Sequence, residues 1–373
     1  MKIVPQLRFQ TISEQGSHYE IGYQRGCLIA TSPEYTQFMT SPQPSSEALS
    51  DANYQSYMKL LVHHCPGLDQ ELQGMADALK VPITQMMHWT YGFSTHHRAC
   101  SMVAALPEKT TDQHFYLARS YEYATFDELI FSITRVTGKH AHMGFSLFHL
   151  GRFDGINDAG LCVAISSAEV VHSSKGQASG LFFAFATRAL LDNCSTVEEA
   201  VQKLHSMPLN DTFTYMLADA QGNCAVVETV ADKGLGYKAV RRPVNGYLSS
   251  FNHFQSQQLQ TMFPKRKNFS HWREEAVDTL FRKDQVSRDD LLHLLKTKIP
   301  EGLCYHDYNG YFGTLRSMLF DVSASKLYVC FGSPQLHPYF EADWHTPLGV
   351  NSTMVDYIEE TAPQEFWKNV RGF

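Results

Sequence analysis

The chain has 373 residues, of which 43% are hydrophobic and 18% charged, which excludes a disordered chain and predicts a globular protein with an ample core. This length allows one large domain or two ordinary ones. The formal net charge is -7 and no long run of Lys or Arg is present, so broad binding to nucleic acid or to an anionic membrane surface is not expected.

The cysteines are spaced singly, without a C-x-x-C pair. In a chain of this size, that spacing indicates reduced thiols rather than a disulfide framework. Residues 1–6 lack the apolar run and the small-residue cleavage site of a signal peptide, and no stretch has the pattern of a membrane span. We therefore expect a cytoplasmic enzyme or binding protein.

The first hundred residues are predicted to be mostly helical after an extended lead-in at residues 1–14. Ser17, with Glu20 three residues later, forms a capping box that begins a helix. Gly22 and Gly26 share one face of that helix, because they are four residues apart. A glycine inside a helix costs about 1 kcal/mol relative to alanine. We therefore expect another backbone to pack closely against this face.

Two further helical regions follow. Residues 33–50, rich in Ser and Pro, are predicted as a loop or helix junction. Residues 51–79 show helical apolar spacing with a break at Pro66-Gly67, and a last helix is predicted from Thr84 to about Phe93.

The helical texture ends at Cys100, where we predict a β-hairpin. Its apolar runs, 99–106 and 114–122, flank a polar, turn-rich connector. The first strand begins at the cysteine, and the second ends in Arg119 and Glu122. A guanidinium delivered next to a thiol favours the thiolate, which is the reactive form.

Strands and helices then alternate in blocks. Strands are predicted at 129–136, 145–150, 155–166 (a hairpin with its turn at 157–160), 213–218, 224–230, 235–240, 247–251, 316–322 and 326–331, and helices at 181–192, 196–206, 268–281 and 288–296. This order favours an α+β fold in which two antiparallel sheets carry helices on their outer faces.

Several common catalytic motifs are missing from the sequence. No phosphate-binding glycine loop, H-E-x-x-H metal motif, G-x-S-x-G elbow or papain-like cysteine signature is present. The adjacent pairs His63-His64 and His96-His97 are poor metal ligands, because neighbouring residues on a helix point about 100° apart. We therefore expect neither a metal nor a cofactor.

A cysteine that begins a strand directly after a helical leader fits an N-terminal nucleophile. If the bond between Ala99 and Cys100 is cut, the new α-amino group can serve as the general base of its own thiol. The ordinary pKa of such a group is about 7.7–8.0, close to the ideal for proton transfer near neutral pH. No external histidine is then required.

The chain resembles the acyl-coenzyme A:6-aminopenicillanic acid acyltransferase family, a branch of the N-terminal-nucleophile hydrolases, and more distantly the choloylglycine hydrolases. Five places carry this resemblance, and they lie in the family's order. They are the G-x-x-Y-E-x-G-x-x-x-G pattern at 16–26, the nucleophile pair Cys100-Ser101, the A-R-S-Y-E stretch at 118–122, the G-x-N-x-x-G-L pattern at 155–161 and F-N-H-F at 251–254.

The resemblance implies a four-layer αββα fold and attack by Cys100 on a linear amide or thioester. Arg119 would lie beside the thiol, and Glu122, at the position of the family's Asp, would hold either the nucleophile's amine or Arg119. Asn252 would help to form the oxyanion hole. Substrate contacts are assigned to Tyr121, Ser166, Arg273 and Arg316, and the sequence leaves open which of the two arginines lies in the site.

The resemblance also implies a division into a helical pro-segment, 1–99, and a catalytic domain, 100–373, separated by self-cleavage between Ala99 and Cys100. The expected partners are a small amide or thioester substrate and the cleaved segment itself, and a homo-oligomer stays open. Penicillin-type, bile-salt-type, acyl-homoserine-lactone-type and peptide amides all fit.

Two departures from the family pattern motivate alternatives. Ala99 stands where glycine is common, and Glu122 replaces Asp. One alternative is therefore an unprocessed member that binds a small acyl or peptide ligand without catalysis. The other is an uncleaved cysteine hydrolase with an external base, for which the sequence places no histidine.

Overall fold

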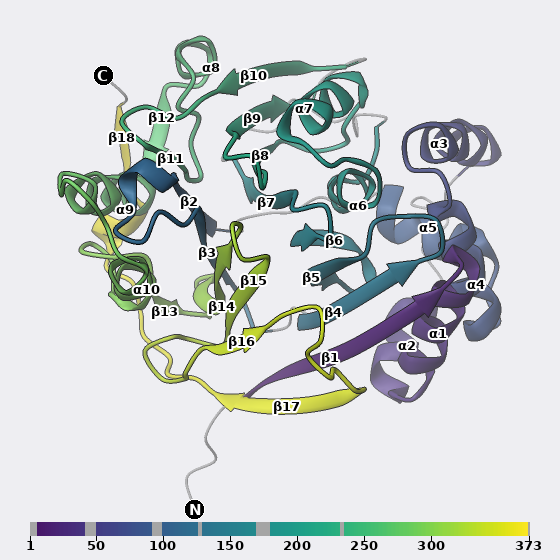
Figure 1. Cartoon of the computed structure of the whole chain (residues 1–373). Coiled ribbons are helices and arrows are strands. Elements are labelled where there is room, and N and C mark those ends of the chain that lie inside the picture. Colours follow the sequence, from purple (N-terminus) through teal and green to yellow (C-terminus); the bar gives the residue numbers. More distant parts are fainter. Residues whose placement is uncertain are drawn as a thin grey trace, which may run out of the picture.

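Two β-sheets face each other at the centre of the computed structural model, which describes residues 6–41, 50–91, 99–125, 129–168, 180–231 and 235–371 (Figure 1). Among these residues the larger sheet has nine strands, in the spatial order β10 (Tyr237–Arg241), β9 (Cys224–Val230), β8 (Phe213–Ala218), β7 (Cys162–Ser167), β6 (Leu150–Asn157), β5 (His142–Leu147), β4 (Leu129–Val136), β1 (Gln6–Gly16) and β17 (Asn351–Asp356). Neighbouring strands are antiparallel except β1 and β4, which are parallel.

The second sheet carries the predicted hairpin at its centre. Its strands follow the order β11 (Tyr247–Ser250), β2 (Ala99–Ala105), β3 (Tyr116–Tyr123), β14 (Phe312–Asp321), β15 (Lys326–Phe331) and β16 (Phe340–Ala342), with β13 (His306–Asp307) beside β14. A separate pair is formed by β12 (Lys265–Lys267) and β18 (Asn369–Arg371). Short 3-10 helices lie at Pro107–Lys109, in the hairpin connector, and at Gln364–Trp367.

Helices cover the outer faces of both sheets. On the larger sheet, α6 (Phe183–Asn193) packs on β6 and β7, and α7 (Val197–Ser206) packs on β8 and β9. On the smaller sheet, α9 (Asn268–Leu280) and α10 (Arg288–Lys296) cover β11, β3 and β14, and α8 (Gln257–Met262) precedes them in the chain. The result is the expected four-layer αββα sandwich, visible from left to right in Figure 1.

The N-terminal region is not purely helical. It contains α1 (His18–Ala30), α2 (Pro33–Thr40), α3 (Asp51–His64), α4 (Leu68–Leu79) and α5 (Ile83–Tyr91), but the predicted lead-in is strand β1. This strand lies between β4 and β17, so the larger sheet is completed by residues from both ends of the chain (Figure 1). Residues from both sides of position 99 therefore share the larger sheet.

The glycine face of α1 packs as predicted. Ser17 caps the helix with the complete capping box to Glu20. A Cβ added to Gly22 would lie 1.9 Å from the carbonyl oxygen of Glu71 on α4, and one added to Gly26 would lie 2.8 Å from that of Met75. Neither position accepts a side chain without moving α4.

Two local predictions were wrong. Residues 33–40 form α2 rather than a loop, because Ser32 caps the helix and proline is well suited to its first turn. The predicted single strand at 145–150 is a tight hairpin between β5 and β6, with Phe148 and His149 at positive φ (47° and 62°). Both φ values are positive, as in a type I′ turn. Such turns usually contain Asn-Gly or Asp-Gly, so the residue types Phe and His did not indicate a turn here.

A buried cluster of charges joins the N-terminal region to the sandwich. We call Glu14, Arg25, Glu71, Arg188 and Asp192 the N-terminal ion cluster. Arg25 donates to both oxygens of Glu14 (2.6 and 2.7 Å) and also to Glu71, while Arg188 on α6 donates to Glu71 (3.1 Å) and to Asp192 (2.9 Å). Every member is at most 6% exposed in its side chain, so these pairs are shielded from water.

Candidate active site

The hairpin register brings the thiol of Cys100 and the guanidinium of Arg119 together. Cys100 pairs with Tyr121 and Met102 pairs with Arg119, so all four side chains lie on the face that looks toward the larger sheet. Arg119 Nη2 lies 3.1 Å from Cys100 Sγ. The sequence predicted this contact, and the structure has it.

Asp154, which sequence reasoning missed, shares its carboxylate between two arginines. It projects from β6 of the facing sheet and lies 3.6 Å from Arg119 Nε and 3.0 Å from Arg316 Nη2. Burial lowers the pKa of Arg119, but the neighbouring Cys100 and Asp154 outweigh burial and leave that pKa raised. The only signal in the sequence was a carboxylate between two apolar-rich stretches of β6, which also contains Arg152 and Asn157.

Asn252 lies two residues after the end of β11, and it contacts the nitrogen of Cys100. The backbone N–H of Cys100 donates to Asn252 Oδ1 at 3.1 Å, and Arg273 Nη2 donates to the same oxygen. Asn252 Nδ2 instead donates to the end of β7, to the carbonyl of Ser167 (2.8 Å) and to Ser166 Oγ (3.3 Å). The acceptor end of this amide thus faces the nucleophile.

Glu122 lies on the opposite face of the hairpin from the thiol, toward α9. It is contacted by Arg273 (3.4 Å), Thr314 (3.5 Å) and Ser120. Burial raises the pKa of Glu122 to about 7, although Arg273 and Ser120 act in the other direction. Burial likewise lowers the pKa of Arg273 to about 10.

The two candidate arginines occupy different layers. Arg273 on α9 bridges Asn252, Glu122 and Ser101, whose Oγ is 3.0 Å from Arg273 Nη1. Arg316 lies between the sheets, and its guanidinium carbon is 4.1 Å from the ring centre of Tyr121. It also donates a hydrogen bond to Asp154, which in turn contacts Arg119. Arg273 is therefore linked to Cys100 through Asn252, and Arg316 is linked to Arg119 through Asp154 on the other side of the sheet.

The remaining predicted residues also border this cluster. Ser166 Oγ donates to the carbonyl of Phe251 at 3.2 Å and accepts from Asn252. Tyr121 packs against Phe153, with ring centres 5.2 Å apart. Cys100 is only 1% exposed and Ala99, at the predicted cleavage point, is likewise 1% exposed. We call Cys100, Arg119, Glu122, Asn252 and Arg273 the Cys100 cluster.

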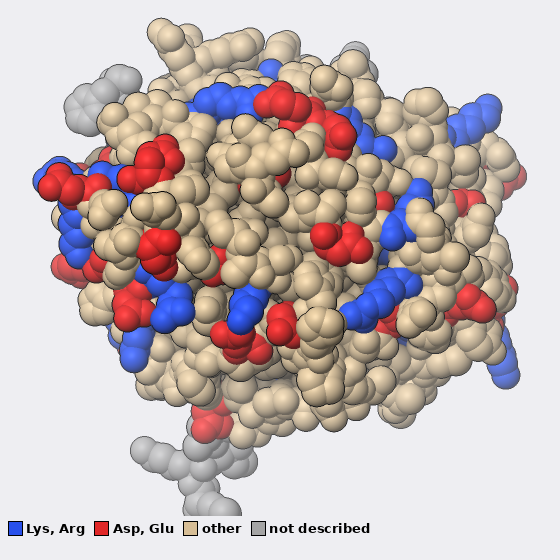
Figure 2. Space-filling view, viewed as in Figure 1, with Lys and Arg blue, Asp and Glu red and all other residues tan. Residues whose placement is uncertain are grey.

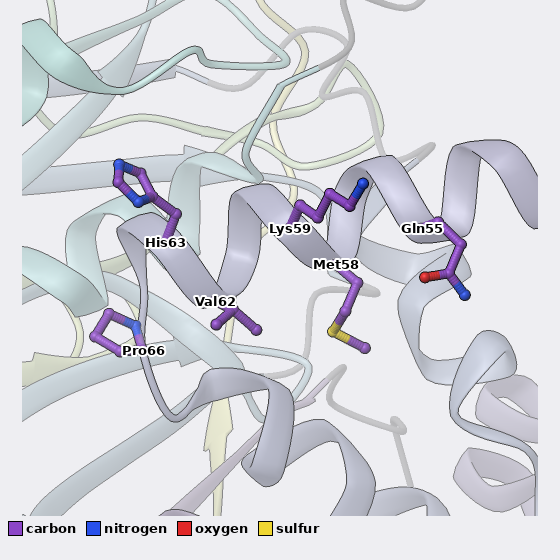
Figure 3. A pocket seen from close by; sticks show the side chains of 6 residues that line it. All are labelled: Gln55, Met58, Lys59, Val62, His63 and Pro66. Atoms are coloured by element: carbon purple, nitrogen blue, oxygen red, sulfur yellow. The ribbon is translucent and has the colours of Figure 1, made fainter.

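Other candidate sites fared differently. In the described parts of the chain, no three His, Cys, Asp or Glu side chains are arranged to hold a metal, and no helix has the length and apolarity to cross a membrane. Figure 2 shows Lys and Arg interspersed with Asp and Glu on the face it presents. A surface groove on the outside of α3 is lined by Gln55, Met58, Lys59, Val62, His63 and Pro66, none of which is a predicted site residue (Figure 3).

The chain matches the family model of acyl-coenzyme A:6-aminopenicillanic acid acyl-transferase over residues 108–336, more than half of its 373 residues. The chain belongs to this family. Arg119, Glu122, Asn252, Arg273 and Arg316 lie within the matched range, and Cys100 lies just before it. The family is of the N-terminal-nucleophile type, as the sequence motifs indicated.

Solved structures with a similar arrangement include three enzymes of low sequence identity. They are a Caenorhabditis elegans N-acylethanolamine-hydrolyzing acid amidase ortholog (14% identity, TM-score 0.45, 60% of this chain and 93% of that chain), a mutant of conjugated bile acid hydrolase from Clostridium perfringens (14%, 0.44, 71% and 99%) and penicillin V acylase from Agrobacterium tumefaciens (17%, 0.43, 74% and 98%). No curated protein sequence matches the chain.

Proposed function

We propose that this family member cleaves or transfers the acyl group of a linear amide or thioester through an acyl-enzyme on Cys100. An N-terminal nucleophile uses its sulfur to attack and its nitrogen as the base. The observation that carries this proposal is that each of these two atoms of Cys100 has its own polar contact. Sγ lies 3.1 Å from the guanidinium of Arg119, and the nitrogen of Cys100 lies 3.1 Å from Asn252 Oδ1.

Hydrolysis of the bond between Ala99 and Cys100 would turn that nitrogen into a free amine. Its N–H groups would keep Asn252 Oδ1 as their acceptor, and its lone pair would accept the thiol proton. The positive charges of Arg119 and Arg273 disfavour an ammonium group between them, so the amine stays in its proton-accepting form. The same guanidinium of Arg119 stabilises the thiolate that results.

The thiolate would then attack the substrate carbonyl, and the protonated amine would give its proton to the departing nitrogen or sulfur. Water or an acceptor amine would attack the thioester and regenerate the thiol. In the present arrangement Asn252 Nδ2 donates to β7, so an oxyanion donor at Asn252 would require this amide to turn. Its role as holder of the Cys100 nitrogen needs no rearrangement.

The structure also supports the proposal that residues 1–99 stay bound after cleavage. Strand β1 lies inside the larger sheet, and Glu71 of α4 is paired with Arg188 of α6. Release of the segment would break these pairs and open the sheet between β4 and β17. The proposed product is therefore a two-chain protein of unchanged overall fold.

A non-catalytic binding protein is the second candidate, and one observation favours it. Ala99 and Cys100 form a continuous strand, with Ala99 paired to Glu122, and both residues are 1% exposed. In this form the nitrogen of Cys100 belongs to an amide, which is no base.

Intact mass under denaturing conditions, combined with turnover, tests both candidates. Wild type should split at Cys100 and hydrolyse members of a panel of acyl p-nitroanilides and thioesters, whereas Cys100→Ala should remain at 42.3 kDa and lose at least about 10³-fold in turnover. Cys27→Ala, which removes an exposed cysteine, is the matched control and should match wild type. Retained turnover in Cys100→Ala would contradict the proposal, and a single uncleaved species without turnover would favour the binding protein.

A further inference from the structure

We propose that Ser270 and His253, supported by Glu274, are positioning residues that fix Asn252 against the nitrogen of Cys100. The inference rests on the proposed function, because it assigns a purpose to the contact between Asn252 and the nucleophile. None of the three touches the thiol. They act through the backbone of Asn252.

The first link joins Asn252 to α9. Its backbone N–H donates to Ser270 Oγ at 3.1 Å, and both residues are buried, with Ser270 1% exposed. A buried N–H without an acceptor is costly, so this hydroxyl determines where the chain after β11 settles. Removing it would release the backbone of Asn252 rather than its side chain.

The second link fixes the direction of the Ser270 hydroxyl. His253 Nδ1 lies 2.8 Å from Ser270 Oγ, and His253 Nε2 lies 3.4 Å from Glu274 Oε2. Burial raises the pKa of Glu274, but His253, Gln255 and Arg266 outweigh it and hold the pKa at about 2, so this group is a carboxylate that only accepts hydrogen bonds. We therefore assign the imidazole proton of His253 to Nε2, the nitrogen that faces this carboxylate.

The consequence is a one-way chain of hydrogen bonds. With Nε2 protonated, Nδ1 accepts the Ser270 hydroxyl proton, and the lone pairs of that oxygen are left for the N–H of Asn252. Ser270 and Glu274 are four residues apart on α9 and share one face with Arg273, which holds Asn252 Oδ1. Helix α9 thus contacts Asn252 twice, at its backbone N–H through Ser270 and at its side-chain oxygen through Arg273.

Ser, His and Glu in this order also make up a hydrolase triad, but Ser270 is not placed as a nucleophile. Its oxygen already accepts the backbone N–H of Asn252 at 3.1 Å. The geometry points to a scaffold for Asn252. This difference decides which experiment is informative.

The test measures the reactivity of Cys100 itself, because no substrate is required for it. In the proposed mechanism the nitrogen of Cys100 takes the thiol proton, so displacement of Asn252 lowers the rate at which iodoacetamide alkylates this thiol. Intact mass and peptide mapping follow the reaction in a Cys27→Ser background, which removes the exposed cysteine. Ser270→Ala and His253→Phe should each slow alkylation about tenfold, since small displacements of a reactive group have effects of this size.

Two further variants separate positioning from a loss of structure. His253→Asn keeps an oxygen near the place of Nδ1 and should restore the rate to within about threefold of the parent. Ser250→Ala removes another buried hydroxyl of the same region, one without a hydrogen-bond partner among the described residues, and should leave the rate unchanged. Circular dichroism at the assay temperature confirms that each variant is folded.

Several results would overturn the inference. They are an unchanged rate in Ser270→Ala and His253→Phe, an equal fall in Ser250→Ala, and a His253→Asn variant as slow as His253→Phe. Failure of the proposed function would look different, because the parent would then remain at its full-length mass, without cleavage before Cys100. That outcome would remove the inference along with its premise.

Discussion

Two buried clusters in this molecule each contain glutamate in contact with arginine, but the electrostatics of the two glutamates differ. In the N-terminal ion cluster, Glu71 contacts Arg25 and Arg188 together, and Asp192 contacts Arg188. In the Cys100 cluster, Glu122 has Arg273 at 3.4 Å as its closest guanidinium contact. Both groups of side chains are withdrawn from water.

The difference appears in the pKa values. Burial raises the pKa of Glu71, but Arg188 and Arg25 outweigh it and hold that pKa well below its usual range, and the same balance lowers the pKa of Asp192 to about 2. For Glu122 burial wins, and the pKa rises to about 7. Buried charge by itself therefore marks no function. A buried carboxyl whose pKa is raised to about 7, in contact with an arginine whose pKa is lowered by burial, is the more informative sign.

The largest expected effect comes from breaking the well-compensated cluster. Glu71→Gln leaves the charges of Arg25 and Arg188 short of a counter-ion in a buried site, and we expect the free energy of unfolding to fall by about 3–5 kcal/mol. Urea unfolding at neutral pH measures this change. Alkylation of Cys100 in the remaining folded protein should be unaffected, because Glu71 is no part of the Cys100 cluster.

Glu198→Gln is the matched control for this variant. Glu198 pairs with Arg242 at 2.6 Å, but its side chain is 60% exposed, and such pairs contribute about 0–1 kcal/mol. Equal effects of the two substitutions would show that the N-terminal ion cluster does not stabilise the join between the N-terminal region and the sandwich.

A smaller effect with the opposite dependence on pH is expected at Glu122. Its pKa is raised from 4.5 to about 7 on folding, so the stability linked to it is fully present below about pH 4.5 and is lost as the pH rises through 7. Between pH 5 and pH 7.5 wild type should lose about 2–3 kcal/mol relative to Glu122→Gln, which cannot ionise.

Urea unfolding of both proteins at the two pH values measures that difference. Asp192 supplies the contrast, because its lowered pKa adds stability above its unfolded value of 3.8 that is lost only as the pH falls through about 2. If wild type and Glu122→Gln lost stability in parallel, the carboxyl of Glu122 would be charged throughout, and the distinction between the two clusters would fail.

Local signals in the sequence predicted many of the secondary-structure elements and one contact of the candidate site. The capping box of Ser17 and Glu20, the hairpin that starts at Cys100, and the pairing of Arg119 with the thiol depend on neighbours along the chain or on one strand register. Patterns of this kind are readable because the contacts repeat with the period of a helix or a strand.

The unpredicted parts depend on contacts between distant elements. Asp154 meets Arg119 and Arg316 across the two sheets, and Ser270 meets Asn252 across a helix and a strand end. The periodicity of apolar residues in the sequence does not indicate such contacts between distant elements. Pairing of β1 with β17 was missed for the same reason, since it joins residues near opposite ends of the chain.

The last prediction concerns the packing that brings Glu71 to its arginines. Alanine is usually better than glycine inside a helix by about 1 kcal/mol, so Gly22→Ala would stabilise α1 if its face were open. Here the added Cβ would lie 1.9 Å from the carbonyl oxygen of Glu71, and α4 must move away. We therefore expect the sign to reverse, with a loss of about 1–3 kcal/mol in urea unfolding. Combining Gly22→Ala with Glu71→Gln should cost less than the sum of the single changes, because the first already draws Glu71 from Arg25. Full additivity would mean that α1 and α4 separate without disturbing the N-terminal ion cluster, and that glycine packing and charge pairing stabilise this junction independently.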